Sequence, residues 1–171
     1  MQESLNIDKS DFKNKTDLYN HIADQIKAIV ESERMVIPNL CNTSSVLKMY
    51  LKDINWVGFY LIKGKELILG PFQGKPACIR IPIGKGVCGT AALKNESQVV
   101  VDVDRFPGHI ACDSDSRSEI VIPFRYKGKV IGVLDVDSPL TERFDDDDKN
   151  GLKLITSVLE TACDWGSFVL Y

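Results

Sequence analysis

The chain has 171 residues, a length that fits one folded domain, because single hydrophobic cores stop growing beyond about 250 to 300 residues. A composition of 44% hydrophobic and 26% charged residues is typical of a globular protein and excludes a disordered or fibrous one. The net charge of -3 and the scattered lysines and arginines provide no basic surface, so we expect no nucleic-acid partner.

The N-terminal residues lack both the basic region and the apolar region of a signal peptide, and no apolar run approaches about 18 residues. We therefore expect a cytoplasmic protein with no membrane partner. Cytosolic reductants keep thiols free, so the five cysteines are interpreted as reduced, catalytic or metal-binding side chains rather than a structural disulfide framework.

The chain is predicted to begin with an N-terminal extension, residues 1–15, followed by one domain, residues 16–171. Apolar residues at helical spacing predict an amphipathic helix over 16–32, capped by Thr16 or Asp17. A weaker pattern predicts a second helix over about 40–52.

The hydrophobic period changes to two at Asn55, which predicts a strand that turns into a second short strand over 66–69. Residues 70–83 contain several prolines and glycines and are predicted to be irregular. They hold Cys78. A helix is predicted over 87–94, with Cys88 in its first turn.

The second half of the chain is predicted to add a strand over 98–103 and a polar loop over 104–117 that contains Cys112. A hairpin of two covered strands, 119–124 and 130–136, follows. The acidic run 145–148 then opens a C-terminal helix. We interpret that run as a helix cap, with a metal site as the alternative.

This order of elements predicts an α+β fold. The N- and C-terminal helices should cover one face of a central antiparallel sheet, and the long loops should cover the other. A ligand would lie beneath those loops.

The five cysteines fall into two groups. Cys41 and Cys163 lie among apolar residues of predicted helices, and we expect them to be buried fillers. Cys88 is expected at a helix N-terminus, where the helix dipole lowers a thiol pKa. Cys78 and Cys112 lie in irregular segments, where two loops could bring their Cα atoms within the distance that a disulfide requires.

Two carboxylates end the last predicted strand on a single face. Asp135 and Asp137 alternate with apolar residues, and they share a face with Ile131 and Val133. Either the strand has reached solvent, or the pair forms a binding site for an ammonium group. Glu119 begins the neighbouring strand and is placed to enter the same cavity, where burial would raise its pKa and make it a proton donor.

Trp56 and Tyr60 are four residues apart on a strand and therefore share a face. They either fill a core or form an aromatic wall that suits a methyl group or a sulfur. A zinc site is a further candidate, but no cysteine pair has the close spacing of zinc motifs, so we predict no metal. The residues considered for it are Cys78, Cys88, Cys112 and His109.

Several segments together closely resemble one family. The segments begin at Asn55 (NWVGFY), Gly70 (GPFQGKPAC), Gly84 (GKGVCG), His109 (HIACD), Ser118 (SEIVIP) and Gly132 (GVLDVDSP). In this order, over about residues 16–165, they resemble the GAF-type free methionine-(R)-sulfoxide reductases. The resemblance implies that residues 16–171 form a GAF-type catalytic domain.

The resemblance also implies roles for the site residues. Cys112 looks like the nucleophile that attacks the sulfoxide sulfur, and Glu119 would protonate the departing oxygen. Cys78 would resolve the resulting sulfenic acid as a disulfide, which thioredoxin would reduce. Cys88 matches the third cysteine of the family, an auxiliary resolver or relay.

For the substrate, the resemblance implies that Asp135 and Asp137 hold the ammonium group of free methionine sulfoxide, while Trp56, Tyr60 and Glu119 line the pocket. It implies no resident cofactor, since electrons would come from the thioredoxin and NADPH system. It also suggests a homodimer.

Two other functions remain open on the sequence. One is a non-catalytic GAF module that senses a small molecule, because a fold by itself does not decide function. The other is a redox sensor or a peroxide-reducing protein. A redox sensor or a peroxide-reducing protein would leave Asp135 and Asp137 without a role.

Overall fold

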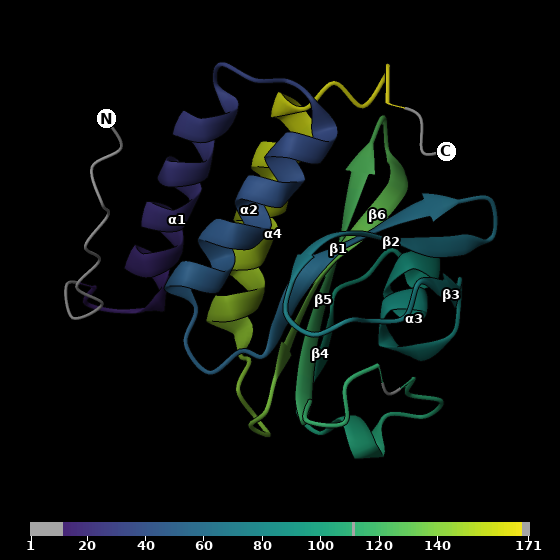
Figure 1. Ribbon diagram of the computed structural model, residues 1–171. Helices are drawn as coiled ribbons and strands as arrows, with labels where there is room; N and C mark the ends of the chain where they lie inside the picture. The colour runs from purple at the N-terminus through teal and green to yellow at the C-terminus, as the bar shows by residue number, and fades with distance from the viewer. Residues whose placement is uncertain (1–11, 111, 169–171) are drawn as a thin grey trace.

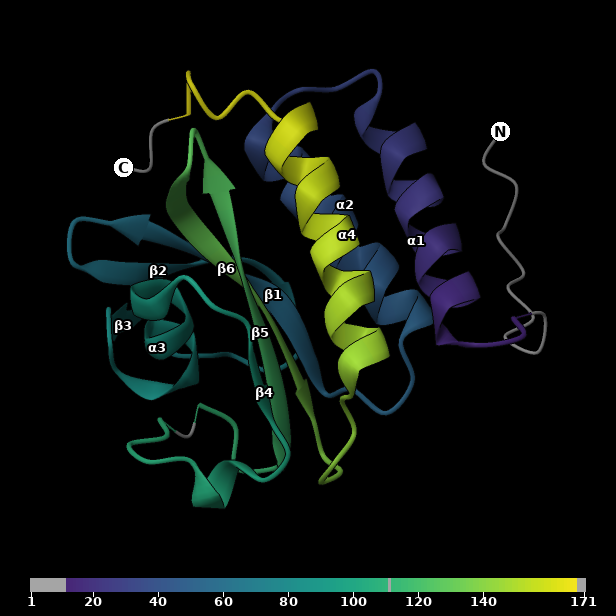
Figure 2. The ribbon, with the colours of Figure 1, turned by 180° about the vertical axis from the view of Figure 1, so that it is seen from behind.

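The structure is a computed structural model that describes residues 12–110 and 112–168. It has the predicted α+β fold, built on a six-stranded antiparallel sheet with the strand order β3-β2-β1-β6-β5-β4. Helices α2 and α4 pack directly on one face of this sheet and α1 covers them from the outside, whereas α3 and the long loops lie over the opposite face (Figure 1; Figure 2).

The helices and strands of the structure have the following bounds. The helices are α1 (Lys15–Val30), α2 (Val36–Tyr50), α3 (Gly86–Lys94) and α4 (Asp146–Ala162), with a 3-10 turn η1 (Val103–Arg105). The strands are β1 (Trp56–Lys63), β2 (Glu66–Gln73), β3 (Arg80–Pro82), β4 (Gln98–Val100), β5 (Ser118–Tyr126) and β6 (Lys129–Ser138).

The larger apolar core lies between the sheet and the three covering helices. Phe59, Ile120 and Leu134 point from the sheet into this core and are fully buried, as are Leu40 and Leu152 of the helices. A smaller cluster on the opposite face includes Tyr60, Val121 and Val133. Both faces of β1, β5 and β6 are therefore covered, as the sequence predicts for the central hairpin.

The acidic run before α4 is a helix cap, as predicted. The Asp145 side chain accepts a hydrogen bond from the backbone N–H of Asp148, and the Asp148 side chain accepts one from that of Asp145. This reciprocal capping box satisfies two N–H groups that the helix itself leaves unpaired. Asp148 is also buried against Arg143 and the hydroxyl of Tyr19.

Three boundary predictions were wrong. The cap of α1 is Asn14, whose side chain accepts from the N–H of Asp17, rather than Thr16 or Asp17. Helix α2 begins at Val36, and the segment predicted to be irregular contains the end of β2 and all of β3. Pairing explains the last difference, because Phe72 of β2 lies opposite Gly58 of β1, a long-range contact that local composition does not encode.

The β5–β6 hairpin turns at Lys127 and Gly128, which both have positive φ angles of 50° and 79°. Two such residues form the tight turn whose twist matches that of the paired strands. The predicted N-terminal extension, residues 1–15, lies mostly outside the described residues. Among those that are described, no helix is both long enough and apolar enough to cross a membrane.

Candidate active site

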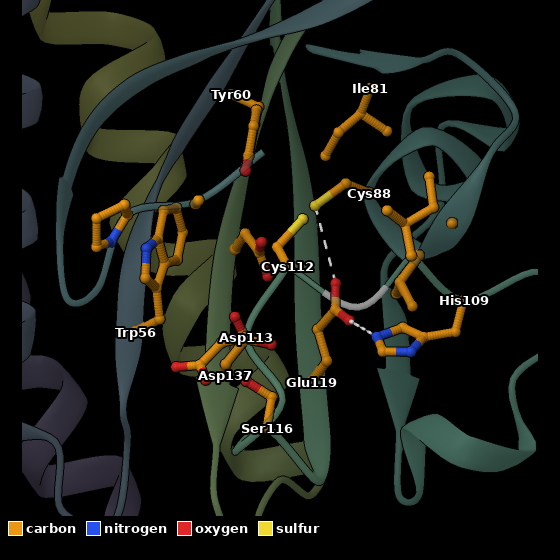
Figure 3. A pocket seen from close by; sticks show the side chains of 16 residues that line it. Trp56, Tyr60, Ile81, Cys88, His109, Cys112, Asp113, Ser116, Glu119 and Asp137 are labelled. Atoms are coloured by element: carbon orange, nitrogen blue, oxygen red, sulfur yellow. Dashed lines mark hydrogen bonds and ion pairs between the residues drawn. The ribbon is translucent and has the colours of Figure 1, made fainter. Parts of the chain in front are cut away.

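A small cavity lies on the sheet face opposite the three covering helices (Figure 3). Its floor is formed by β1, β5 and β6, and one wall is formed by the start of α3. Two loops close it: the Cys78 loop, residues 74–79 between β2 and β3, and the Cys112 loop, residues 106–117 between η1 and β5. The cavity volume is about 30 Å³, which is room for about two water molecules.

Cys78 and Cys112 are joined by a disulfide, with their Cα atoms 5.5 Å apart. The bond links the two loops, and Cys112 lines the cavity. The sequence-based expectation that these two segments can bring a cysteine pair within disulfide distance is therefore met. The Pro and Gly content of both segments allows this approach, since neither cysteine is held inside a helix or a strand.

Cys88 lies in the first turn of α3, as predicted, and is buried at the cavity wall. Its Sγ donates to Oε1 of Glu119 at 3.8 Å. The expectation of a lowered thiol pKa was wrong. Burial, together with the nearby carboxyl groups of Asp135 and Glu119, raises the pKa of Cys88 well above its ordinary value, because desolvation and negative neighbours both disfavour a thiolate.

Three carboxyl groups share the cavity. Glu119 lies opposite Asp137 in the β5–β6 pairing, and Asp135 lies two residues before Asp137 on the same face of β6. Glu119 and Asp135 are each only 6% exposed. Burial, and then the neighbouring Asp135, raises the pKa of Glu119 well above its ordinary value, because both favour the protonated form of the acid.

One carboxyl oxygen of Asp135 is open. Burial raises the pKa of Asp135 to about 7, while Cys88 and Glu119 hydrogen-bond to its side chain, and its Oδ1 is buried with no hydrogen-bond partner among the residues that the structure describes. The pKa of Asp137 is also raised, first by burial and then by the neighbouring Asp135. Buried polar atoms are nearly always paired in folded proteins, so this carboxyl oxygen, on a residue that lines the cavity, is an acceptor open to a ligand.

Trp56 and Tyr60 form the aromatic wall of this cavity. Their rings are stacked with centroids 5.9 Å apart, and both polar atoms hold the Cys78 loop. The indole N–H of Trp56 donates to the carbonyl of Lys75 at 3.2 Å, and the hydroxyl of Tyr60 donates to the carbonyl of Cys78 at 3.0 Å. Gly58 between them is required, because a Cβ there would lie 2.6 Å from the Trp56 ring.

Comparison with known proteins identifies the family. The model of the GAF domain matches residues 15–163. The chain is 50% identical over 147 residues to the free methionine-R-sulfoxide reductase of Escherichia coli, covering 86% of this chain and 89% of that one. Among solved structures it is similar to the free methionine-R-sulfoxide reductase from Neisseria meningitidis in complex with its substrate, with a TM-score of 0.85 and 46% identity over 88% of this chain and 91% of the other.

A structure of fRMsr of Staphylococcus aureus in complex with substrate is 53% identical, with a TM-score of 0.81, and the match covers 84% of this chain and 94% of that one. The chain belongs to the free methionine-R-sulfoxide reductase family of GAF-domain proteins. This membership confirms the resemblance recognised in the sequence, and it agrees with the observed sheet and helix arrangement.

The five cysteines of this family member divide differently from the expectation. Cys163 is buried and accepts a hydrogen bond from Asn39 at 3.5 Å, as expected for a filler. Cys41 is exposed, so its prediction as a buried residue was wrong. The weak apolar pattern of α2 hid the reason: Leu40 occupies the buried face, and the next residue points about 100° away from it.

Lining residues such as Asp113 and Ser116 were missed by the sequence analysis, which considered His109 only as a zinc ligand. Asp113 and Ser116 line the cavity from the Cys112 loop, and the Nε2 of His109 lies 3.7 Å from Oε2 of Glu119. Burial lowers the pKa of His109, which favours its neutral form. Asp113 follows Cys112 directly in the sequence, so its place beside the site was open to prediction, whereas nothing local marks Ser116.

The zinc tetrad considered from the sequence is not available in this form, because its Cys78 and Cys112 are bonded to each other. A different group could hold a cation: ligand atoms of Cys88, Glu119 and Asp135 lie within 4.8 Å of one another. Burial raises the pKa of all three groups, so a cation that bound here would have to displace their protons.

Proposed function

We propose that this protein reduces free L-methionine-(R)-sulfoxide to L-methionine through a sulfenic acid on Cys112, which Cys78 resolves as a disulfide that thioredoxin reduces. One observation carries the proposal. The Cys78–Cys112 disulfide lies at a cavity with a buried acid, Glu119, and an unpaired carboxyl oxygen of Asp135. Thiol redox chemistry and recognition of an ammonium group are thereby brought to one place.

In the first step the sulfur of reduced Cys112 attacks the sulfoxide sulfur. The proton of Glu119 goes to the sulfoxide oxygen, and its raised pKa supports this role because the acid must be protonated at working pH. The S–O bond of the substrate and the bond between the two sulfur atoms then break, and the hydroxyl passes to the Cys112 sulfur. Methionine leaves, Cys112 becomes a sulfenic acid, and the proton of its former thiol is returned to Glu119. The substrate is reduced by two electrons and Cys112 is oxidised by two.

Recognition of the free amino acid is assigned to Asp135 and Asp137. An ammonium group would donate to the unpaired Oδ1 of Asp135, and its positive charge would favour ionisation of both carboxyl groups, whose pKa values are raised without it. Peptide linkage removes that charge. The stacked Trp56 and Tyr60 rings would contact the methyl group and the sulfur.

The auxiliary role is assigned to Cys88, which donates to Glu119 and so keeps the acid oriented. In this disulfide-bonded form the cavity volume of about 30 Å³ is far below the range of about 300 to 1,000 Å³ that small-molecule pockets have. We therefore assign substrate binding to the reduced protein, in which the two cysteine loops are free to separate.

The test is turnover by Cys112→Ser, followed as methionine released in the presence of thioredoxin, its reductase and NADPH. We expect at least about a thousandfold loss, because a hydroxyl is a far weaker nucleophile than a thiol. Cys41→Ser is the matched control, since this exposed cysteine lies outside the cavity and its loss should leave turnover unchanged.

Two results would contradict the proposal. Normal turnover by Cys112→Ser would remove the nucleophile, and equal use of a peptide containing methionine sulfoxide would remove the role of Asp135 and Asp137. Tight binding of a small metabolite without turnover would favour a sensing module instead, and consumption of peroxide alone would favour a peroxide-reducing protein.

A further inference from the structure

A second link joins the two cysteine loops beside the disulfide. Lys75, three residues before Cys78, forms an ion pair with Asp113, the residue after Cys112, with Nζ and Oδ1 3.3 Å apart. The same ammonium group also pairs with Asp115. The Cys78 loop thus carries the cation, and the Cys112 loop carries both anions.

The anionic side of this link is fixed to the sheet. Asp113 accepts from the side-chain amide of Asn55 at 3.1 Å and from the backbone N–H of Asp115 at 3.0 Å, and its side chain is only 8% exposed. The amide of Asn55 also donates to Ser116, while its backbone N–H donates to the carbonyl of Asp137 in β6. Asp113 is therefore a pre-positioned acceptor at the edge of the site.

The cationic side is a long side chain on a loop. Lys75 lies between Gly74, which has a φ of 145°, and Pro76, and its side chain is 59% exposed. The carbonyl of Lys75 is held from inside by the indole of Trp56, whereas its ammonium group reaches across the outside to the Cys112 loop. These contacts hold the Cys78 loop over the cavity, together with the Tyr60 to Cys78 hydrogen bond, the hydrogen bond from the Leu69 N–H to the Ile79 carbonyl, and the disulfide.

We propose that Lys75, with Asp113 and Asp115, is a latch that positions Cys78 for the resolving step. This inference rests on the proposed function, because it assigns a part to the step in which Cys78 meets the Cys112 sulfenic acid. In that step the Cys78 sulfur attacks the Cys112 sulfur, the S–S bond forms, the S–O bond breaks, and the hydroxyl leaves as water with the proton of the Cys78 thiol.

An ion pair between the two loops would speed disulfide formation because the two cysteines must first come close together. The disulfide requires the Cα atoms of two loops to come to 5.5 Å, and the rate of resolution depends on how often the loops are docked. Attraction between an ammonium group and two carboxylates raises that population before any covalent bond exists. Exposed ion pairs are individually weak, so the effect should be a moderate change in rate.

The experiment compares Lys75→Gln with the wild type in a single turnover. Reduced protein is mixed with one equivalent of methionine sulfoxide, and three quantities are followed: methionine released, free thiols lost, and sulfenic acid trapped by dimedone. We expect methionine release to keep its wild-type rate and disulfide formation to slow about two- to tenfold, so that more sulfenic acid is trapped.

The salt dependence of the rate of disulfide formation separates an electrostatic role of Lys75 from a purely structural one, because only the electrostatic role is weakened by salt. Raising it from about 0.1 M to about 1 M shortens the Debye length from about 10 Å to about 3 Å, so disulfide formation in the wild type should slow towards the rate of Lys75→Gln. The variant should be insensitive to salt. Lys75→Arg, which keeps the positive charge between Asp113 and Asp115, should retain most of the wild-type rate.

Lys65→Gln is the matched control, because it removes the same charge from the exposed β1–β2 turn, and disulfide formation should keep its wild-type rate. A wild-type rate of disulfide formation in Lys75→Gln, or equal salt dependence in both proteins, would overturn the latch.

A second arm of the experiment generates the Cys112 sulfenic acid with hydrogen peroxide, which releases water. If the wild type released no methionine, the proposed function would fail, while this arm would still test the latch.

Discussion

The two faces of the sheet are built for different purposes. In β6 the side chains of Leu134 and Val136 enter the apolar core beneath the helices, whereas Asp135 and Asp137 enter the cavity beneath the loops. The helical face therefore gains free energy by burying apolar surface, while the loop face contains buried carboxyl groups that oppose folding unless they are protonated or paired. The comparison indicates that stability and chemistry are largely separated across a single strand.

The largest effect on this comparison is expected from Leu134→Ala. Leu134 is fully buried in the larger core, and removing such a side chain costs about 2 to 5 kcal/mol through lost transfer energy and the cavity left behind. Urea unfolding measures the change in the free energy of unfolding. The folded fraction of Leu134→Ala should keep the wild-type turnover rate. A lower turnover rate with an unchanged free energy of unfolding would contradict the idea that the helical face serves stability and the loop face serves chemistry.

A substitution on the other face of the same strand, Asp137→Asn, should lower activity and leave stability intact. It removes a charged acceptor for the ammonium group, which we expect to lower kcat/KM for the free amino acid about ten- to a hundredfold, since hydrogen bonds to charged groups contribute about 1.5 to 3 kcal/mol. The free energy of unfolding should not fall, because a partly desolvated carboxyl group is replaced by a neutral amide. Unchanged kinetics would mean that the carboxylate is merely solvated.

The pH dependence of stability tests the loop face alone. The pKa of Asp135 is raised by burial from 3.8 to about 7, so the folded state holds this proton more tightly than the unfolded state does. Its contribution to stability is complete below about pH 4 and is lost as the pH rises through about 7, by at most about 1.4 kcal/mol per pH unit for one proton.

Urea unfolding of the disulfide-bonded protein at about pH 5 and about pH 8 measures this loss. Asp135→Asn should weaken the dependence, which Glu119 and Asp137 share because burial raises their pKa values as well, and should make the protein more stable than the wild type at the higher pH. An identical pH dependence in the variant and the wild type would show that Asp135 does not carry the effect.

Much of the fold could be predicted because local patterns agreed with tertiary structure. The alternation of Leu-Asp-Val-Asp in β6 assigned each residue to its face, and the acidic run before α4 identified a helix cap. The extension of β2 to Gln73 was missed, because it depends on pairing with β1 across a register shift. The exposure of Cys41 was missed for the related reason that its helix has only a weak apolar stripe.

The sequence predicted which residues form the candidate site. It did not predict how deeply they are buried or how their neighbours change their pKa values. The sequence motif marked Cys78, Cys88, Cys112 and Glu119, and family membership followed from it. The pKa of Cys88 was predicted in the wrong direction, because a position at a helix N-terminus is visible in sequence, whereas burial against two carboxyl groups from β5 and β6 depends on how distant segments pack.

By itself the sequence determined the alternation that divides the sheet into two faces and the residues able to carry thiol and acid chemistry, because strand period and side-chain chemistry are local properties. Only the tertiary structure decided which groups meet. The Cys78–Cys112 disulfide, the unpaired oxygen of Asp135, and the ion pairs of Lys75 with the Cys112 loop depend on contacts between segments far apart in the chain, and local sequence does not encode such contacts.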